Sequence, residues 1–106
     1  MTKNELQGIA FQLISNAGEA FSYFYDSVEQ AKVGDFEKAK ELIALGEQSL
    51  NNAHKAQTDL LVAEANEEEM DFSVVLVHAQ DHLMTTIMYE RIAKQLISIL
   101  EGVKSE

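Results

Sequence analysis

The chain has 106 residues, of which 18 are Asp or Glu and 8 are Lys or Arg, so its formal net charge at pH 7 is -10. This length predicts a single domain, residues 1–106, with one modest hydrophobic core. The sequence contains no Cys, which excludes disulfides, thiolate zinc sites and a cysteine nucleophile. The acidic balance argues against binding to nucleic acid or to an anionic membrane surface, so we expect partners with basic faces.

The first residues of the chain do not have the form of a signal peptide, because the charged start, the apolar run and the small-residue cleavage site are missing. The apolar run Val74–Val77 is far too short to cross a membrane. We therefore expect a cytoplasmic protein that does not insert into the membrane.

The first predicted helix covers the apolar series that runs from Leu6 to Val28 in steps of three and four residues. Thr2, with Glu5 three residues later, has the form of a capping box at its start. Gly34 is a natural stop, and Asp35 can cap the helix that follows.

The second predicted helix follows a similar series from Phe36 to Leu61, with Gly46 inside it as a mild helix breaker. Acidic residues crowd positions 64–69, and we interpret them as a loop. The short connection at Gly34 makes the first two helices antiparallel neighbours.

The third predicted helix begins at about Ser73, with Asp71 or Ser73 as its cap, and runs toward Gly102. Together the three segments predict an all-α, antiparallel, up-down-up three-helix bundle.

Apolar residues of the third helix occupy more than one face in its N-terminal half. They spill onto a sector that is charged further along the helix: Leu76, Val77, Leu83, Met84 and Ile87. A helix that is apolar on all sides is buried on all sides, and two partner helices cannot cover a third completely. We therefore expect another copy of the chain to cover the remainder.

A polar stripe on the same helix consists of His78, Asp81, His82 and Thr85. Further along, this sector holds four large apolar residues, Ile92, Leu96, Ile99 and Val103, so the pattern predicts that the stripe faces the interior. Buried titratable groups are costly unless they are paired or functional. The stripe is therefore either a hydrogen-bonded core cluster or a functional site.

Two kinds of chemistry are open to this stripe. His78 and His82 are four residues apart and can reach one metal ion, although neither a protease ligand set nor the Glu-x-x-His pairs of di-iron bundles accompany them. Alternatively, a neutral imidazole can act as a nucleophile on phosphorus, with Gln80, His82 or Thr85 as hydrogen-bond donors. The chain has no Gly-rich phosphate loop or kinase motif, so its phosphoryl group would come from another phosphorylated molecule.

The ten residues 76–85, LVHAQDHLMT, resemble the hallmark of the lactose/cellobiose-family enzyme IIA component of the bacterial sugar phosphotransferase system. Three further segments are similar to the same family: residues 16–20 (NAGEA), 34–39 (GDFEKA) and 53–60 (AHKAQTDL). The resemblance therefore extends over all three predicted helices.

This resemblance implies a phosphoryl carrier in which His78 is the phosphorylated histidine. It implies that His78 accepts the group from the histidine-containing phosphocarrier protein and donates it to a cysteine of the cognate enzyme IIB, which drives sugar uptake with phosphorylation. Gln80 and His82 match residues beside the phosphoryl group. Asp81 matches a carboxylate at the threefold axis of a homotrimer, where three copies hold one divalent cation, commonly Mg²⁺, a hard ion that prefers oxygen ligands.

A second class of function remains open from the residues alone. In this alternative, the chain is a helical interaction module without catalytic activity, whose polar cluster holds a metal ion that stabilises an oligomer. His54, which stands between polar neighbours on the second helix, is interpreted as a packing residue. The resemblance implies that the membrane component of the system selects the sugar, so lactose, cellobiose and chitobiose all fit this chain.

Overall fold

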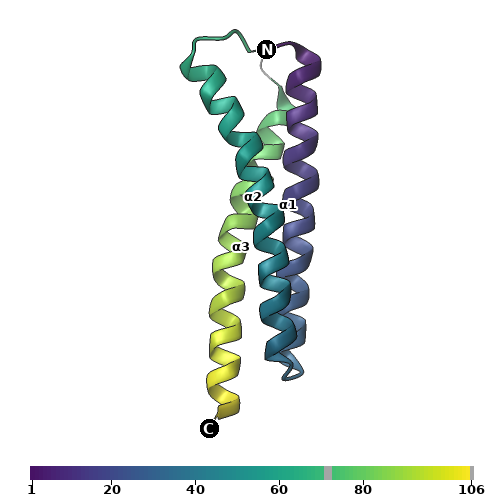
Figure 1. Ribbon diagram of the computed structural model, residues 1–106, viewed down its shortest axis with the longest axis vertical. Coiled ribbons are helices and arrows are strands. Elements are labelled where there is room, and N and C mark those ends of the chain that lie inside the picture. The colour runs from purple at the N-terminus through teal and green to yellow at the C-terminus, as the bar shows by residue number, and fades with distance from the viewer. Residues whose placement is uncertain (71–72, 106) are drawn as a thin grey trace.

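Three long helices form a rod in the computed structural model, which describes residues 1–70 and 73–105 (Figure 1). The helices are α1 (Lys3–Lys32), α2 (Phe36–Ala65) and α3 (Val74–Ser105), and the rod measures 57 × 19 × 19 Å. They run down, up and down along its axis, which confirms the predicted antiparallel three-helix bundle. None of the helices in the described ranges is long and apolar enough to span a membrane.

Side-chain caps define the starts of the helices where the sequence predicts them. Thr2 Oγ1 accepts a hydrogen bond from the backbone N–H of Glu5 (3.1 Å), and Asp35 Oδ1 accepts one from the backbone N–H of Lys38 (3.0 Å). Gly34 makes the turn between α1 and α2 with a φ of +87°, which glycine adopts without strain.

The third helix is capped by Ser73, whose Oγ accepts a hydrogen bond from the N–H of Leu76 (3.3 Å). The other predicted cap, Asp71, lies outside the described residues. The acidic segment 64–69 was predicted to be a loop. Its first two residues still belong to α2, which ends at Ala65, and the loop begins at Asn66.

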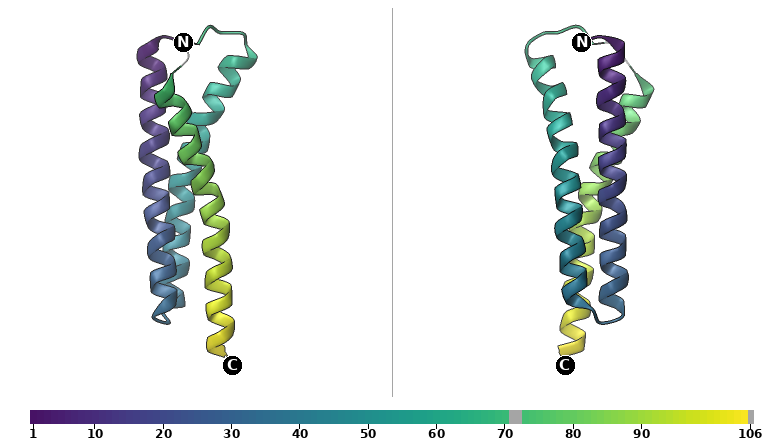
Figure 2. Two further views of the ribbon diagram at one scale, coloured as in Figure 1. Left: turned by 180° about the vertical axis from the view of Figure 1, so that it is seen from behind. Right: turned by 45° about the vertical axis from the view of Figure 1, so that its right-hand side comes forward.

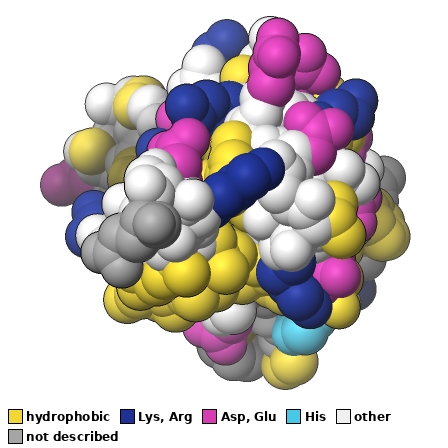
Figure 3. All heavy atoms as spheres, turned by 90° about the horizontal axis from the view of Figure 1, so that it is seen from below, with side chains coloured by type: hydrophobic (Ala, Val, Ile, Leu, Met, Phe, Trp, Pro, Cys, Tyr) yellow, Lys and Arg dark blue, Asp and Glu magenta, His cyan; other side chains and the backbone are white. Residues whose placement is uncertain are grey.

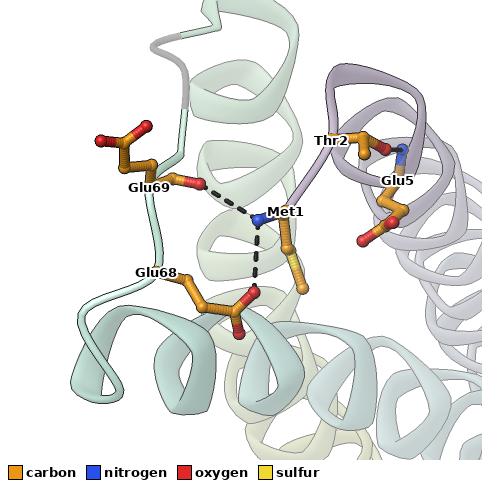
Figure 4. A network of polar contacts seen from close by, with 5 residues as sticks. All are labelled: Met1, Thr2, Glu5, Glu68 and Glu69. Atoms are coloured by element: carbon orange, nitrogen blue, oxygen red, sulfur yellow. Dashed lines mark hydrogen bonds and ion pairs between the residues drawn. The ribbon is translucent and has the colours of Figure 1, made fainter.

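Met1 joins the start of α1 to the segment that follows α2 (Figure 4). The terminal ammonium of Met1 donates to Glu68 Oε1 (3.2 Å) and to the backbone carbonyl oxygen of Glu69 (3.1 Å). The Met1 side chain also packs against the core. The start of α1 is thus anchored to the connection that precedes α3.

Helix α1 packs along both other helices, whereas α2 and α3 contact each other over a shorter length. Figure 2 shows the cause: α3 crosses the α1–α2 pair obliquely, and the C-terminal end of α2 diverges from its neighbours. Large buried side chains such as Phe24, Leu13 and Leu83 alternate with buried alanines in the core. The small residues allow the helices to approach closely around the large ones.

The closest approach between α1 and α2 is at Gly46, which faces the ring of Phe24. A Cβ atom at position 46 would lie 2.5 Å from Phe24 Cε1, and Phe24 is fully buried and cannot move aside freely. We expect Gly46→Ala to lower the free energy of unfolding by about 1–2 kcal/mol, because overpacking outweighs the gain in helix propensity.

The matched control is Gly8→Ala, since a Cβ at position 8 meets no atom within 4 Å. This variant is expected to be more stable than the wild type by about 0.5–1 kcal/mol. Thermal unfolding of both variants checks the pair, and a Gly46→Ala variant that is as stable as Gly8→Ala would contradict the described packing.

Helix α3 carries apolar residues on more than one face, as predicted, but its core face lies between the two predicted sectors, and Val77 and Met84 of the surplus sector are exposed. The face toward the core is built from Ala79, Leu83, Thr86, Ala93 and Ile97, all buried. The residues assigned above to the interior lie on the outer face, where Ile92, Leu96, Ile99 and Val103 are 39–66% exposed. The prediction that these four residues face the interior was wrong. The core face includes small residues such as Ala79 and Ala93, so the larger apolar side chains of the outer face gave the stronger hydrophobic periodicity. Leu83, assigned to the surplus sector, is fully buried.

Figure 3 views the rod from the end that holds the α1–α2 turn and the C-terminus. Hydrophobic side chains gather on one side of this end, and most of the charged groups in the view lie elsewhere. Val33 and Val103, which line one groove at this end of the rod, are exposed. The single chain thus leaves apolar surface uncovered.

Candidate functional site

The polar stripe of α3 lies on the outer face of the helix, near its N-terminal end. His78, Asp81 and Thr85 are exposed, and His82 is half-buried. The prediction of a buried polar cluster is therefore wrong for the single chain. In its place, a histidine one turn into α3 is open to other molecules.

The hydroxyl of Thr85 is engaged within its own helix. Thr85 Oγ1 donates to the backbone carbonyl oxygen of Asp81 at 2.9 Å. A hydroxyl has one hydrogen to donate, so Thr85 in this rotamer is not a donor for a further group. Asp81 lies on the same face and is exposed on the outside of the bundle.

His82 lies at the seam between α3 and α1. A Cβ atom at position 18 would be 3.6 Å from His82 Nε2, so the imidazole lies beside the backbone of α1 at Gly18. One turn along, the buried Thr86 Oγ1 donates to the carbonyl oxygen of His82 (2.8 Å) and lies 3.4 Å from that of Ala17. Neither Gly18 nor Thr86 was predicted from the sequence to belong to the site. A glycine inside an otherwise helical pattern is the signal that could have pointed to this contact.

Gln80 belongs to a different surface from His78. Residues two apart on a helix do not face each other, so the side chains of His78 and Gln80 diverge within one chain. Gln80 is half-buried and lines a groove of about 210 Å³ between the diverging end of α2 and the start of α3. The groove walls include Leu61, Met70 and Val77.

A second groove, of about 450 Å³, follows the polar stripe on the outer side of α3. It is lined by Phe21 of α1 and by residues of α3 that include Met84, Met88 and Ile92. The rings of Phe21 and Tyr89 lie 4.6 Å apart, centroid to centroid, at its edge. Burial, with smaller contributions from Tyr25 and Glu29, raises the pKa of the Tyr89 phenol, so this edge of the groove stays uncharged at neutral pH.

His54 is exposed on α2 and lines a groove with Glu47 and Glu90, apart from the polar stripe. Lys94 bridges these two glutamates at 3.4 Å each. Partial burial alone would lower the pKa of Lys94, but the two carboxylates outweigh it and raise the pKa. The structure therefore shows His54 at an exposed, ion-paired surface and not in the core.

Metal ligation within one chain is not supported by the side-chain positions. Across residues 1–70 and 73–105, no group of three or more His, Asp or Glu side chains is placed to hold a metal ion. Asp81 contributes one exposed carboxylate.

Comparison with known proteins identifies the family of this fold and site. Residues 8–101 match the family model described as "PTS system, Lactose/Cellobiose specific IIA subunit". The lactose-specific EIIA component of Staphylococcus aureus is 41% identical over 97 residues, which cover 92% of this chain and 94% of that protein. The N,N'-diacetylchitobiose-specific EIIA component of Escherichia coli is 43% identical over 101 residues, covering 95% and 87% of the two chains.

Solved structures give the same result. The cellobiose-specific enzyme IIA of Bacillus anthracis superimposes with a TM-score of 0.94 at 36% identity, covering all of this chain and 95% of that one. The IIA(Chitobiose) chain of the E. coli IIA(Chitobiose)–HPr complex does so with a TM-score of 0.81 at 41% identity, covering 93% and 96%. The protein thus belongs to the lactose/cellobiose-specific IIA family of the sugar phosphotransferase system.

Proposed function

We propose that the protein is a phosphoryl carrier in sugar uptake and that His78 bears the phosphoryl group. The observation that carries this proposal is the exposed imidazole of His78 on the outer face of α3, with the half-buried His82 one turn away. An acceptor histidine must be reached by two different protein partners in turn, which an exposed helix face allows. Family membership supports the assignment.

The transfer step requires only a nucleophile and stabilising donors. A ring nitrogen of neutral His78 forms an N–P bond to the phosphoryl group, while the N–P bond to the donor's histidine breaks and its electron pair returns to that imidazole. In the second step, a thiolate of enzyme IIB attacks phosphorus, and the electron pair of the breaking N–P bond returns to His78. His82, on the same side of the helix, is the donor available for the phosphoryl oxygens, and Gln80 remains a weaker candidate.

The proposed partners are the histidine-containing phosphocarrier protein, HPr, and the cognate enzyme IIB. A solved complex of a relative with HPr supports the first of these. Both partners must bring a reactive group to His78, so we expect their footprints to overlap on apolar residues near His78, such as Val77 and Met84. Acidic side chains at the rim would steer partners with basic faces.

We expect the two partners to compete for the chain in a modest, transient contact. Chemical-shift mapping with HPr and with enzyme IIB, each alone and then together, checks this expectation. Disjoint footprints, or simultaneous binding of both partners, would rule out a shared surface.

The proposed assembly is a homotrimer in which the α3 helices meet at the centre. From Asp81 onward, the outer face of α3 presents residues at steps of three and four: Asp81, Thr85, Met88, Ile92, Leu96, Ile99 and Val103. His78 lies beyond the N-terminal end of this stripe, where partners can still reach it. This spacing is the one by which helices of several chains interlock in coiled coils. The exposed apolar part of this stripe, from Met88 to Val103, is unusual for a monomer and favours self-association.

The proposed metal is Mg²⁺ or a similar divalent cation, one per trimer, held by Asp81 from each subunit. Asp81 fits such a site because its carboxylate is exposed on the helix face that would meet the other copies. Oxygen ligands suit a hard cation. Bound there, the ion would neutralise carboxylates that otherwise repel one another, and it has no step in the phosphoryl transfer.

The experiment that tests the function is an intact-mass measurement after incubation with phosphoenolpyruvate and the two general phosphotransferase proteins. We expect a gain of one phosphoryl group per chain that is labile in acid and stable in base. No gain, together with a metal-dependent oligomer, would instead favour the non-catalytic interaction module.

A further inference from the structure

Gly18 of α1 lies beside the His82 imidazole at the seam between α1 and α3. Resting on the phosphoryl-carrier function above, we propose that Gly18 is a positioning residue for His82. By leaving space beside the α1 backbone, Gly18 holds the His82 imidazole where a ring N–H can donate to a phosphoryl oxygen on His78.

The packing around position 18 fixes one side of the imidazole. A Cβ at this position would make an ordinary contact, 3.6 Å, with His82 Nε2. A β-branched side chain adds two heavy atoms about 1.5 Å beyond that Cβ in one strongly preferred helix rotamer, so it would crowd the ring more than alanine does. Both residues are half-buried, so the ring lies against α1 and is not free in solvent.

The backbone around the ring is fixed as well. Ala17 and Thr86 are fully buried, and Thr86 Oγ1, which donates to the carbonyl oxygen of His82 at 2.8 Å, lies 3.4 Å from the carbonyl oxygen of Ala17. This buried contact packs the turn of α3 that carries His82 against the turn of α1 that carries Gly18. Because both turns are packed in the core, we expect a branched side chain at position 18 to displace the imidazole before it displaces the backbone.

The consequence for transfer follows from the helix geometry. His78 and His82 are neighbours on the α3 surface, because residues four apart lie one above the other. A donor held in place before the reaction stabilises the charge that develops on the phosphoryl oxygens, and its loss typically slows a reaction by about 100- to 1,000-fold. A donor that is displaced and not removed should slow it less.

The test compares Gly18→Val with Gly18→Ala. The alanine variant adds only a Cβ in ordinary contact, so the His82 ring signals should shift less, and the transfer from phosphorylated HPr should slow less, than in the valine variant. The valine variant should shift the ¹H–¹⁵N signals of the His82 ring in the unphosphorylated protein and slow the transfer by about tenfold or more.

A double variant separates positioning from general damage. If Gly18 acts through His82, then adding Gly18→Val to His82→Ala should slow transfer no further, whereas independent effects would multiply. Full additivity, or unchanged His82 signals in the valine variant, would overturn the proposal. In the wild type itself, a nuclear Overhauser effect between the His82 ring protons and the Gly18 α protons is expected. Its absence would also overturn the proposal, even if no valine variant folds.

Failure of this proposal and failure of the proposed function give different results. A wild-type chain that takes no phosphoryl group refutes the carrier function, and the ring signals then still decide whether Gly18 positions His82. A wild-type chain that is phosphorylated at His78, with the valine variant equally fast, refutes only the role of Gly18.

Discussion

Replacement of His78 by alanine is expected to abolish phosphoryl acceptance while leaving the helical content and the stability of the protein unchanged. The imidazole is the nucleophile in the proposed transfer, and no neighbouring contact can replace the lone pair that forms the N–P bond. The side chain is exposed on a helix, so its loss should change the free energy of unfolding by no more than about 0.5 kcal/mol. Intact mass after incubation with phosphorylated HPr measures acceptance, and circular dichroism measures helicity.

Two other histidine variants serve as controls for that experiment. His54→Ala, on the exposed α2 surface, should accept the phosphoryl group at the wild-type rate. His82→Ala should still accept it, but about 100- to 1,000-fold more slowly, since only a stabilising donor is lost. Normal phosphorylation of a folded His78→Ala variant would remove His78 from the role of acceptor.

Replacement of Asp81 by leucine is expected to give a trimer that no longer needs a divalent cation. Three carboxylates that converge in an apolar seam repel one another strongly unless a cation neutralises them. A chelator should therefore loosen the wild-type trimer. In Asp81→Leu, the repulsion and the metal are removed together, and replacing buried charge by apolar packing is typically neutral or stabilising by about 1–4 kcal/mol.

Sedimentation of the wild type and of Asp81→Leu, each with and without chelator, measures this effect. Asp26→Leu is a matched control, because it makes the same chemical change at an exposed carboxylate of α1 and should respond to chelator as the wild type does. A wild-type monomer would contradict the assembly. An Asp81→Leu trimer that still binds one ion would contradict the assigned metal ligand.

The elements that local chemistry controls could be predicted from the sequence. The starts of the three helices follow from Thr2, Asp35 and Ser73, because a cap hydrogen-bonds to a backbone N–H three residues later and needs no distant partner. The turn follows from Gly34 for the same reason, since its positive φ is a local requirement. The family resemblance likewise rests on contiguous segments, and the comparisons confirm it.

The orientation of α3 could not be predicted, because it depends on packing between distant residues. Periodicity finds the apolar faces of a helix but does not decide which of them meets the core. In this chain, the core face uses Ala79, Thr86 and Ala93, whose small side chains let α1 approach, while larger apolar residues cover the outer face. The contact of Gly18 with His82 is also tertiary, and residues 64 apart in the chain carry no shared local signal.

The most direct test of the proposed carrier function is to locate the phosphoryl group in the phosphorylated wild-type protein. Phosphorus- and nitrogen-detected NMR of the trapped intermediate reports which ring nitrogen is bonded to phosphorus. We expect a single N–P bond, on the imidazole of His78, with the rings of His54 and His82 unmodified. A phosphoryl group on His54, on His82 or on a hydroxyl, with His78 unmodified, would contradict it.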